Sequence, residues 1–324
     1  MSNAKKFQAE YYEQLAKRNE CKNHWCTATG ARCLLQSFDA GQPPARGTLD
    51  DAYSWLVELW ENSRHDKGDS PRTFGNGISR ENWLLKRKHF PSDGKSLSRE
   101  LKVETAIAQA LEPCARNPKP RNGHAVAFSC GNSVATTSGL LGKTRGARRG
   151  FLQIDIVRLC DAEHGELIEL KYLTKSEKPK NGLGLVVGAA FQAALYALTL
   201  ILWHAKEKTL VGSCHSYFKE RPALTLPHWR IKTMANQRCF DGQDRRLLGQ
   251  FSSWLAAELN SVANEYPSEF LGGPLKFWHS FHTYPDAWSS SIPKSEVFET
   301  LTRRWDETPE GPRDLPDLAN VTST

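Results

Sequence analysis

The start of this 324-residue chain lacks the succession of charged, apolar and small residues that forms a signal peptide. We therefore expect a cytoplasmic protein whose eight cysteines stay reduced. Cys21, His24, Cys26 and Cys33 could together hold zinc, but their spacing fits none of the common structural zinc patterns. Unpaired thiols in packed surroundings are the simpler interpretation.

Motifs for several other chemistries are also missing. Gly139 lies two residues too late to begin a phosphate-binding loop that would end at Gly142-Lys143-Thr144, which argues against nucleotide hydrolysis. The chain has no Gly-x-Ser-x-Gly nucleophile elbow. His279 and His282 have no acidic ligand close by in the sequence, so we expect them to be surface or packing residues.

Charge is absent from residues 183–203, a run about long enough to cross a bilayer. A membrane anchor is therefore one interpretation. Gly184, Gly188 and Gln192 within the run, and polar sequence on both sides of it, favour a helix buried in a protein core instead. We expect no membrane partner.

The amino-acid composition is typical of a globular protein, with 39% hydrophobic and 24% charged residues. We expect a helical N-terminal region over 1–95, an α/β core over 96–265, and a C-terminal extension with a loose tail over 266–324. Apolar spacing predicts helices at 7–18, from Thr48, at 79–90 and at 241–263. Thr48 and Asp51 resemble a capping box.

Two β-rich segments, 150–159 and 166–173, flank a turn at 161–165 and predict a hairpin. If it closes around Ala162, positions whose numbers sum to 324 face each other, and Asp155 lies opposite Glu169. Glu169 and Lys171 are two apart and project to one face of their strand. Two carboxylates and an ammonium therefore converge among apolar neighbours, which is costly unless a divalent cation compensates.

A third carboxylate comes from a helix expected over 96–111. Glu104 falls within its apolar stripe, whereas Glu100 lies nearer the edge of the stripe. A glutamate on a buried helix face has a partner, either a basic residue in an ion pair or a metal ion. The ion pair and the metal site stay open as alternatives.

Asp155, the run Glu169-Leu170-Lys171, the upstream Glu104, and Gln192 with Tyr196 downstream resemble the PD-(D/E)XK nuclease superfamily in its RecB-like branch. The resemblance covers about a third of the chain. It implies a restriction-endonuclease-like core, in which helices flank a central mixed sheet.

The resemblance also implies roles for these residues. Asp155, Glu169 and Leu170 would hold Mg²⁺ or Mn²⁺, and Glu104 would act as an additional acidic ligand. Lys171 would orient or activate the attacking water, while Gln192 and Tyr196 would line the site or touch the nucleic acid. Some relatives carry an iron–sulfur cluster, but only Cys214 and Cys239 follow the Gln192 helix here, so we expect none.

The expected partner is DNA, consistent with a net charge of +7. Basic residues lie just before Asp155 and just after Lys171 in the sequence. They could bind the DNA backbone, or they could form only a solvated loop. These residues are Lys143, Arg145, Arg148, Arg149, Lys175, Lys178 and Lys180. The resemblance suggests an endonuclease or other deoxyribonuclease of restriction, anti-phage defence or repair. A helicase, an ATPase, another protein or a second copy of the chain remain possible partners. The alternative is a catalytically inactive nucleic-acid-binding or scaffold subunit that keeps the fold.

Overall fold

The structure is a computed structural model, and it describes most of the N-terminal helices, the sheet and the helices that cover it. The described residues are 3–17, 19, 25–64, 100, 102–104, 107, 126–128, 155–159, 163–178, 181–205, 226–268, 271–289 and 294–302. The predicted helix at 79–90, the basic stretch 143–149, Lys180 and the tail beyond 302 lie outside these ranges.

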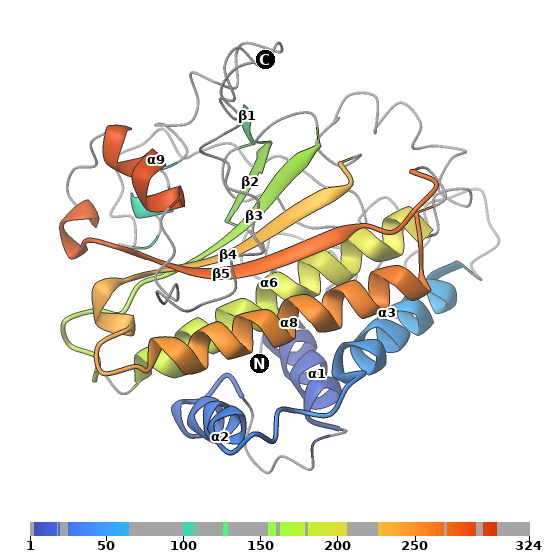
Figure 1. Cartoon of the computed structure of the whole chain (residues 1–324), viewed down its shortest axis with the longest axis horizontal. Coiled ribbons are helices and arrows are strands. Elements are labelled where there is room, and N and C mark those ends of the chain that lie inside the picture. The colour runs from blue at the N-terminus through green and yellow to red at the C-terminus, as the bar shows by residue number, and fades with distance from the viewer. Residues whose placement is uncertain are drawn as a thin grey trace.

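A mixed sheet of five strands forms the centre of the molecule (Figure 1). The strands lie in chain order: β1 (Val126–Phe128), β2 (Ile156–Leu159), β3 (His164–Lys171), β4 (His228–Asn236) and β5 (Lys276–Tyr284). β1, β2 and β3 pair antiparallel, whereas β3, β4 and β5 pair parallel. The protein is therefore of the α/β class.

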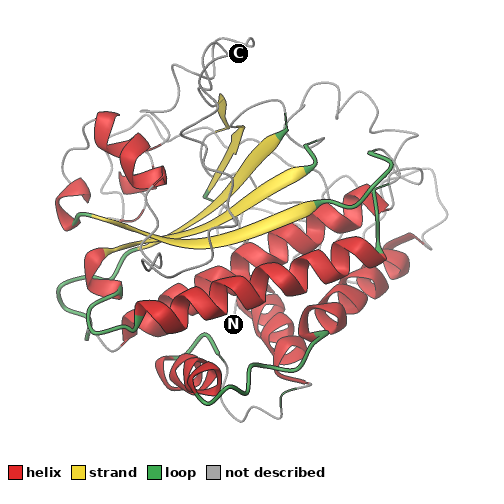
Figure 2. Ribbon diagram, in the orientation of Figure 1, coloured by secondary structure: helices red, strands yellow, loops and turns green. Residues whose placement is uncertain are grey.

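Two long helices provide the crossovers between the parallel strands. Helix α6 (Gly182–Ala205) connects β3 to β4, and α8 (Arg245–Glu265) connects β4 to β5. Both lie against the same face of the sheet (Figure 2). Asp244 caps the first turn of α8, because its side chain accepts hydrogen bonds from the amides of Arg246 and Leu247. This cap explains why α8 begins at Arg245 and not at 241 as the sequence predicted.

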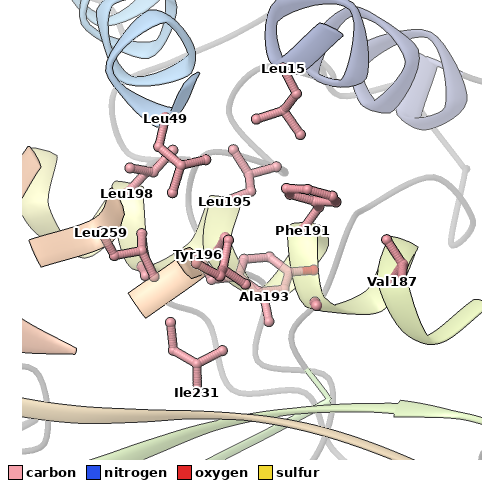
Figure 3. Close-up of a cluster of buried hydrophobic side chains, with 14 of the residues drawn as sticks. Leu15, Leu49, Val187, Phe191, Ala193, Leu195, Tyr196, Leu198, Ile231 and Leu259 are labelled. Carbon is pink, nitrogen blue, oxygen red and sulfur yellow. The ribbon is translucent and has the colours of Figure 1, made fainter. Parts of the chain in front are cut away.

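Three N-terminal helices form a further layer on α6 and α8: α1 (Asn3–Lys17), α2 (Ala28–Asp39) and α3 (Thr48–Arg64). Figure 3 shows Leu15 of α1 and Leu49 of α3 on one side of α6, and Ile231 of β4 on the other. The first turn of α3 is capped from α8, since the carboxylate of buried Glu258 accepts from the amides of Gly47 and Leu49 at 3.2 Å each.

Helix α6 is buried on all sides by these layers. Its segment Gly182–Leu202 is long and apolar enough to cross a membrane by length and composition, and 89% of its most apolar stretch is buried inside the fold. Each buried leucine, valine or phenylalanine contributes about 1.5–3 kcal/mol relative to exposure. Two tyrosine hydroxyls of α1 hold it further, because Tyr11 donates to the carbonyl of Phe191 and Tyr12 to that of Gly188.

A second core lies on the opposite face of the sheet. It joins Ile168 and Leu170 of β3 to Val103, Ile107 and residues of α9 (Lys294–Thr302). A buried ion pair stands beside this core, with Glu166 Oε1 2.6 Å from Lys232 Nζ. Lys232 also donates to the carbonyl of Leu301 in α9, and this hydrogen bond attaches α9 to the sheet.

Two elements were not anticipated from the sequence. Helix α2 begins after the N-cap Thr27, in the segment that contains the candidate zinc residues. There Cys26 is half-buried, Cys33 is exposed and both thiols are free, while Cys21 and His24 lie outside the described residues. Strand β5 lies beyond residue 265, in the segment assigned to a C-terminal extension, and it forms one edge of the sheet.

The crossing of α2 over α6 requires a glycine at position 184. A Cβ atom there would lie 2.7 Å from the backbone nitrogen of Ala28 and 2.7 Å from the carbonyl carbon of Thr27. We predict that Gly184→Ala lowers the free energy of unfolding by about 1–3 kcal/mol, because backbone cannot move aside as a side chain can. Chemical denaturation monitored by circular dichroism measures the change.

Gly188→Ala is the matched control on the same helix. Its Cβ would meet the Cβ of Cys26 at 3.1 Å, and alanine gains about 1 kcal/mol of helix propensity, so the net loss should be smaller. If Gly184→Ala were instead stabilising, as it would be on an isolated helix, the close approach of α2 would be wrong.

Candidate active site

The site begins with the register of the β2–β3 hairpin. Ile156 pairs with Ile168, and Val157 with Leu167, so paired positions sum to 324 as the sequence predicted. Asp155 directly precedes β2 and continues this register towards Glu169. Its Oδ2 accepts a hydrogen bond from the amide of Leu170 at 2.6 Å. The carboxyl of Asp155 is thus held at the carboxyl end of β3.

Glu169 and Lys171 project to the same face of β3, as period-two alternation predicted. Lys171 Nζ lies 2.6 Å from Glu169 Oε1 and donates a second hydrogen bond, 2.8 Å long, to the carbonyl of Leu170. The side chain of Glu169 is 1% exposed and that of Lys171 is 19% exposed. Burial makes such a charge-assisted contact stronger than it would be at the surface.

Glu104 and Glu100 belong to the helical segment that was expected over 96–111. Both carboxylates act electrostatically on Asp155 and on Glu169. Glu104 is buried, as its place in the apolar stripe predicted, with Val103 and Ile107 in the second core beside it. Glu100 was placed at the edge of that stripe, yet its Oε2 accepts from the amide of Tyr172 at 3.2 Å. The site therefore contains a fourth carboxylate that sequence reasoning undervalued.

These charges shift one another's pKa values. Burial raises the pKa of Asp155 well above its usual value, and Glu169 raises it further. Burial likewise raises the pKa of Glu169 to about 7, although the Lys171 ammonium opposes the rise. Burial alone would lower the pKa of Lys171, but Glu169, Glu100 and Asp155 outweigh it and raise that pKa. The carboxylates therefore outnumber the cation that compensates them.

A divalent metal ion is one group that could compensate this excess of acidic side chains. Glu169 Oε2 is buried and has no hydrogen-bond partner among the residues that the structure describes. Oxygen donors from Asp155, Glu169 and Glu104 suit Mg²⁺ or Mn²⁺. Leu170 can offer only its backbone carbonyl, which also accepts a hydrogen bond from Lys171 Nζ, because its hydrocarbon side chain has no ligand atom.

Helix α6 contributes two of the predicted residues. Gln192 Nε2 donates to the hydroxyl of Tyr196 at 3.0 Å. Burial raises the pKa of Tyr196, and the neighbouring Glu169 raises it further. Tyr196 is 0% exposed and Gln192 is half-buried. Tyr196 therefore packs beneath the site and does not reach the surface.

Residues far away in the chain fix the backbone just after Lys171. The hydroxyl of Tyr284, in β5, donates to the carbonyl of Lys171 at 2.7 Å. Buried Asn236, at the end of β4, accepts from the amide of Leu173 and donates to its carbonyl. Neither residue was identified from the sequence. Their hydrogen bonds and that of Glu100 hold the strand end in one position.

Among the remaining predicted residues, Lys175, Lys178, His279 and His282 are not part of this cluster. Lys175 and Lys178 are exposed on the loop after β3, while Lys143, Arg145, Arg148 and Arg149 lie outside the described residues. His279 and His282 are packing residues: His279 bonds with Thr233 and Ser252, and His282 with Ser280 and the carbonyl of Thr300.

Comparison of the chain with models of protein families, with curated proteins and with solved structures finds no match.

We predict that Glu169→Gln stabilises the metal-free protein at alkaline pH. The pKa of Glu169 lies near 7 in the folded chain and near 4.5 in the unfolded one, so the folded state holds the proton more tightly. The stability from this group is present below about pH 4.5 and is lost as the pH rises through 7. The advantage of the variant should therefore grow by about 2–3 kcal/mol between pH 5 and pH 8.

Thermal melts of both proteins in a chelator, at pH 5 and pH 8, measure this difference. Glu177→Gln is the control, since the carboxyl of Glu177 is exposed and its pKa is lowered by hydrogen bonds from Thr174. An equal advantage of Glu169→Gln at both pH values would contradict the prediction.

Proposed function

We propose that this protein is a metal-dependent nuclease that hydrolyses phosphodiester bonds of DNA. The observation that carries the proposal is the convergence of the partly buried Asp155 and Lys171 on the buried Glu169. Glu169 Oε2 there has no hydrogen-bond partner among the described residues. Functional sites collect ionisable groups whose pKa values are strongly perturbed, and this cluster has three.

We further propose that the α/β fold is a restriction-endonuclease-like core of the PD-(D/E)XK type. The support is the order of its parts. An acidic helical segment precedes a hairpin that carries Asp155 and Glu169, and α6 follows with Gln192 and Tyr196. The cluster also lies at the carboxyl end of β3, where β3 is antiparallel to β2 but parallel to β4. Ligands of open α/β sheets bind at the carboxyl ends of their strands.

In this proposal Asp155 and Glu169 hold Mg²⁺ or Mn²⁺, with Glu104 and the Leu170 carbonyl nearby. The ion would lower the pKa of a bound water and neutralise charge on the phosphate. A metal also removes the cost of the buried carboxylates, because it favours their ionised forms. No iron–sulfur cluster enters the proposal.

The role of Lys171 follows from its electrostatics. The surrounding carboxylates raise its pKa, so Lys171 is an ammonium in the metal-free protein. An ammonium donates hydrogen bonds and accepts none. Lys171 therefore orients the attacking water or a phosphate oxygen, and it removes no proton in this state. Glu169 accepts one hydrogen bond from Lys171 Nζ and so limits where that ammonium points.

DNA is the proposed substrate because the net charge of +7 favours a polyanion, and exposed Lys175 and Lys178 follow the site along the chain. A cytoplasmic role in restriction, anti-phage defence or repair, with a helicase, an ATPase or a second copy as partner, belongs to the same proposal. It rests on the resemblance of the site residues alone.

We predict that Asp155→Asn and Lys171→Met reduce cleavage of DNA by at least about 100-fold, because the first weakens the proposed metal site and the second removes the cation beside the attacking water and phosphate. Linear, circular and single-stranded DNA are incubated with the protein in magnesium or manganese and then in a chelator. Cleavage of closed circles identifies an endonuclease, and a requirement for free ends identifies an exonuclease.

Lys175→Met is the matched control for Lys171→Met, because it removes an exposed lysine four residues further along the chain. It should retain cleavage, with at most a modest rise in KM. Equal cleavage by the wild type, Asp155→Asn and Lys171→Met would refute the site. Metal-independent DNA binding without cleavage by the wild type would favour the inactive scaffold instead.

A further inference from the structure

A second group of metal-ligating side chains lies at the other end of β3. Glu163, His164 and His228 each offer one ligand atom, and these atoms all lie within 4.8 Å of one another. His164 begins β3 and Lys171 ends it, seven residues later. At the rise of a β-strand this separates the group from the proposed nuclease site by about 23 Å.

We infer that Glu163, His164 and His228 bind a divalent transition-metal ion, with zinc as the best fit. Two imidazole nitrogens and one carboxylate oxygen form a ligand set that zinc favours and that magnesium does not. Three protein ligands leave a position for water. The chemistry of this group thus differs from that of the all-oxygen group at the opposite strand end.

The sheet itself brings the two histidines together. His164 and His228 are register partners at the heads of the parallel strands β3 and β4, with ring centroids 4.9 Å apart and ring planes at 43°. The amide of His228 donates to the carbonyl of Glu163 at 3.1 Å, which fixes the third residue against the same strand head. Backbone pairing therefore holds the three residues in place before any ion binds.

The surroundings suit an ion that enters from solvent. Glu163 is exposed and both histidines are half-buried. The ring of Trp278, on β5, meets the ring of His228 edge-on at 5.7 Å and limits its orientation. Ligands of a tetrahedral zinc ion lie about 3.3 Å apart, so side-chain rotation must shorten the present spacing, which reaches 4.8 Å, by up to about 1.5 Å.

Binding there would connect the hairpin turn before β3 to the head of β4. These strand heads are joined in sequence only through α6 and the residues after it. The ion would act as a structural clamp on the parallel half of the sheet. It would stabilise the fold by RT ln(1 + c/Kd), where c is the free zinc concentration, which is about 2.7 kcal/mol at one hundred times Kd.

The full chain is first freed of metal by a chelator and then titrated with Zn²⁺ in excess magnesium, with a chromophoric zinc indicator as competitor. We expect one zinc per chain from this site and a rise in Tm of roughly 3–8 °C at zinc about one hundred times Kd. His164→Gln and His228→Gln should weaken binding at least about 100-fold and remove the rise. Glu163→Gln, at an exposed position, should weaken it about 10-fold or more.

Three controls locate the ion. Lys276→Gln alters an exposed residue in register with His228, and Glu177→Gln alters an exposed carboxylate elsewhere; both should bind zinc as the wild type does. Asp155→Asn should also retain zinc, whereas His164→Gln should retain magnesium-dependent cleavage. Circular dichroism confirms that each variant is folded, and Glu163→Gln carries the test if a histidine variant is not.

Unchanged zinc binding in folded Glu163→Gln and His228→Gln proteins would overturn the inference. Loss of zinc only on Cys26→Ser with Cys33→Ser would place the ion at the N-terminal cysteines and overturn it as well. Loss of zinc binding in the Asp155→Asn protein would place the zinc in the proposed nuclease site, and it would also overturn the inference.

Discussion

The pairing of β2 with β3 is the constraint on which the candidate active site depends. It sets Ile156 against Ile168 inside the second core, and a slip by one residue would turn Ile156 away from it. The same register delivers Asp155 to the amide of Leu170, next to Glu169. The apolar pairs thus stabilise an arrangement that the charged groups would not adopt on their own, since their mutual repulsion and desolvation oppose it.

The parts of the fold that could be predicted share a local and periodic pattern. The hairpin register followed from two β-rich segments and the turn between them, and Ile156 with Ile168 confirms it. The apolar run at 183–203 predicted the bounds of α6 to within two residues at each end. Burial of Glu104 followed from the helical spacing of its neighbours. In each case the neighbours along the chain are also the neighbours in space.

The parts that could not be predicted depend on residues that are distant in the chain. Tyr284 and Lys171, which are joined by a hydrogen bond, are 113 residues apart in the sequence. Glu258 is about 210 residues from the start of α3, which it caps. No local sequence pattern predicts contacts at such separations. Helix α2 is different. Its buried residues have helical spacing behind the N-cap Thr27, so the sequence contains a local signal for this helix: Ala31, Leu34, Leu35 and Phe38. Strand β5 has hydrophobic and polar side chains buried on both faces, so it lacks the clean alternation of a half-exposed strand.

Helix α6 connects the stability of the molecule to the geometry of the site. It is the most apolar helix of the described chain, yet its polar pair, Gln192 and Tyr196, lies where it approaches Glu169. The helix is held there by Tyr11 and Tyr12 of α1 and by close backbone contact with α2 at Gly184. The N-terminal helices have no residue in the carboxylate cluster, but they determine where Tyr196 stands. A dense core transmits displacement because its side chains cannot be compressed independently. Loosening α1 or α2 should therefore disturb the carboxylate cluster from the far side of α6, without altering any charge within it.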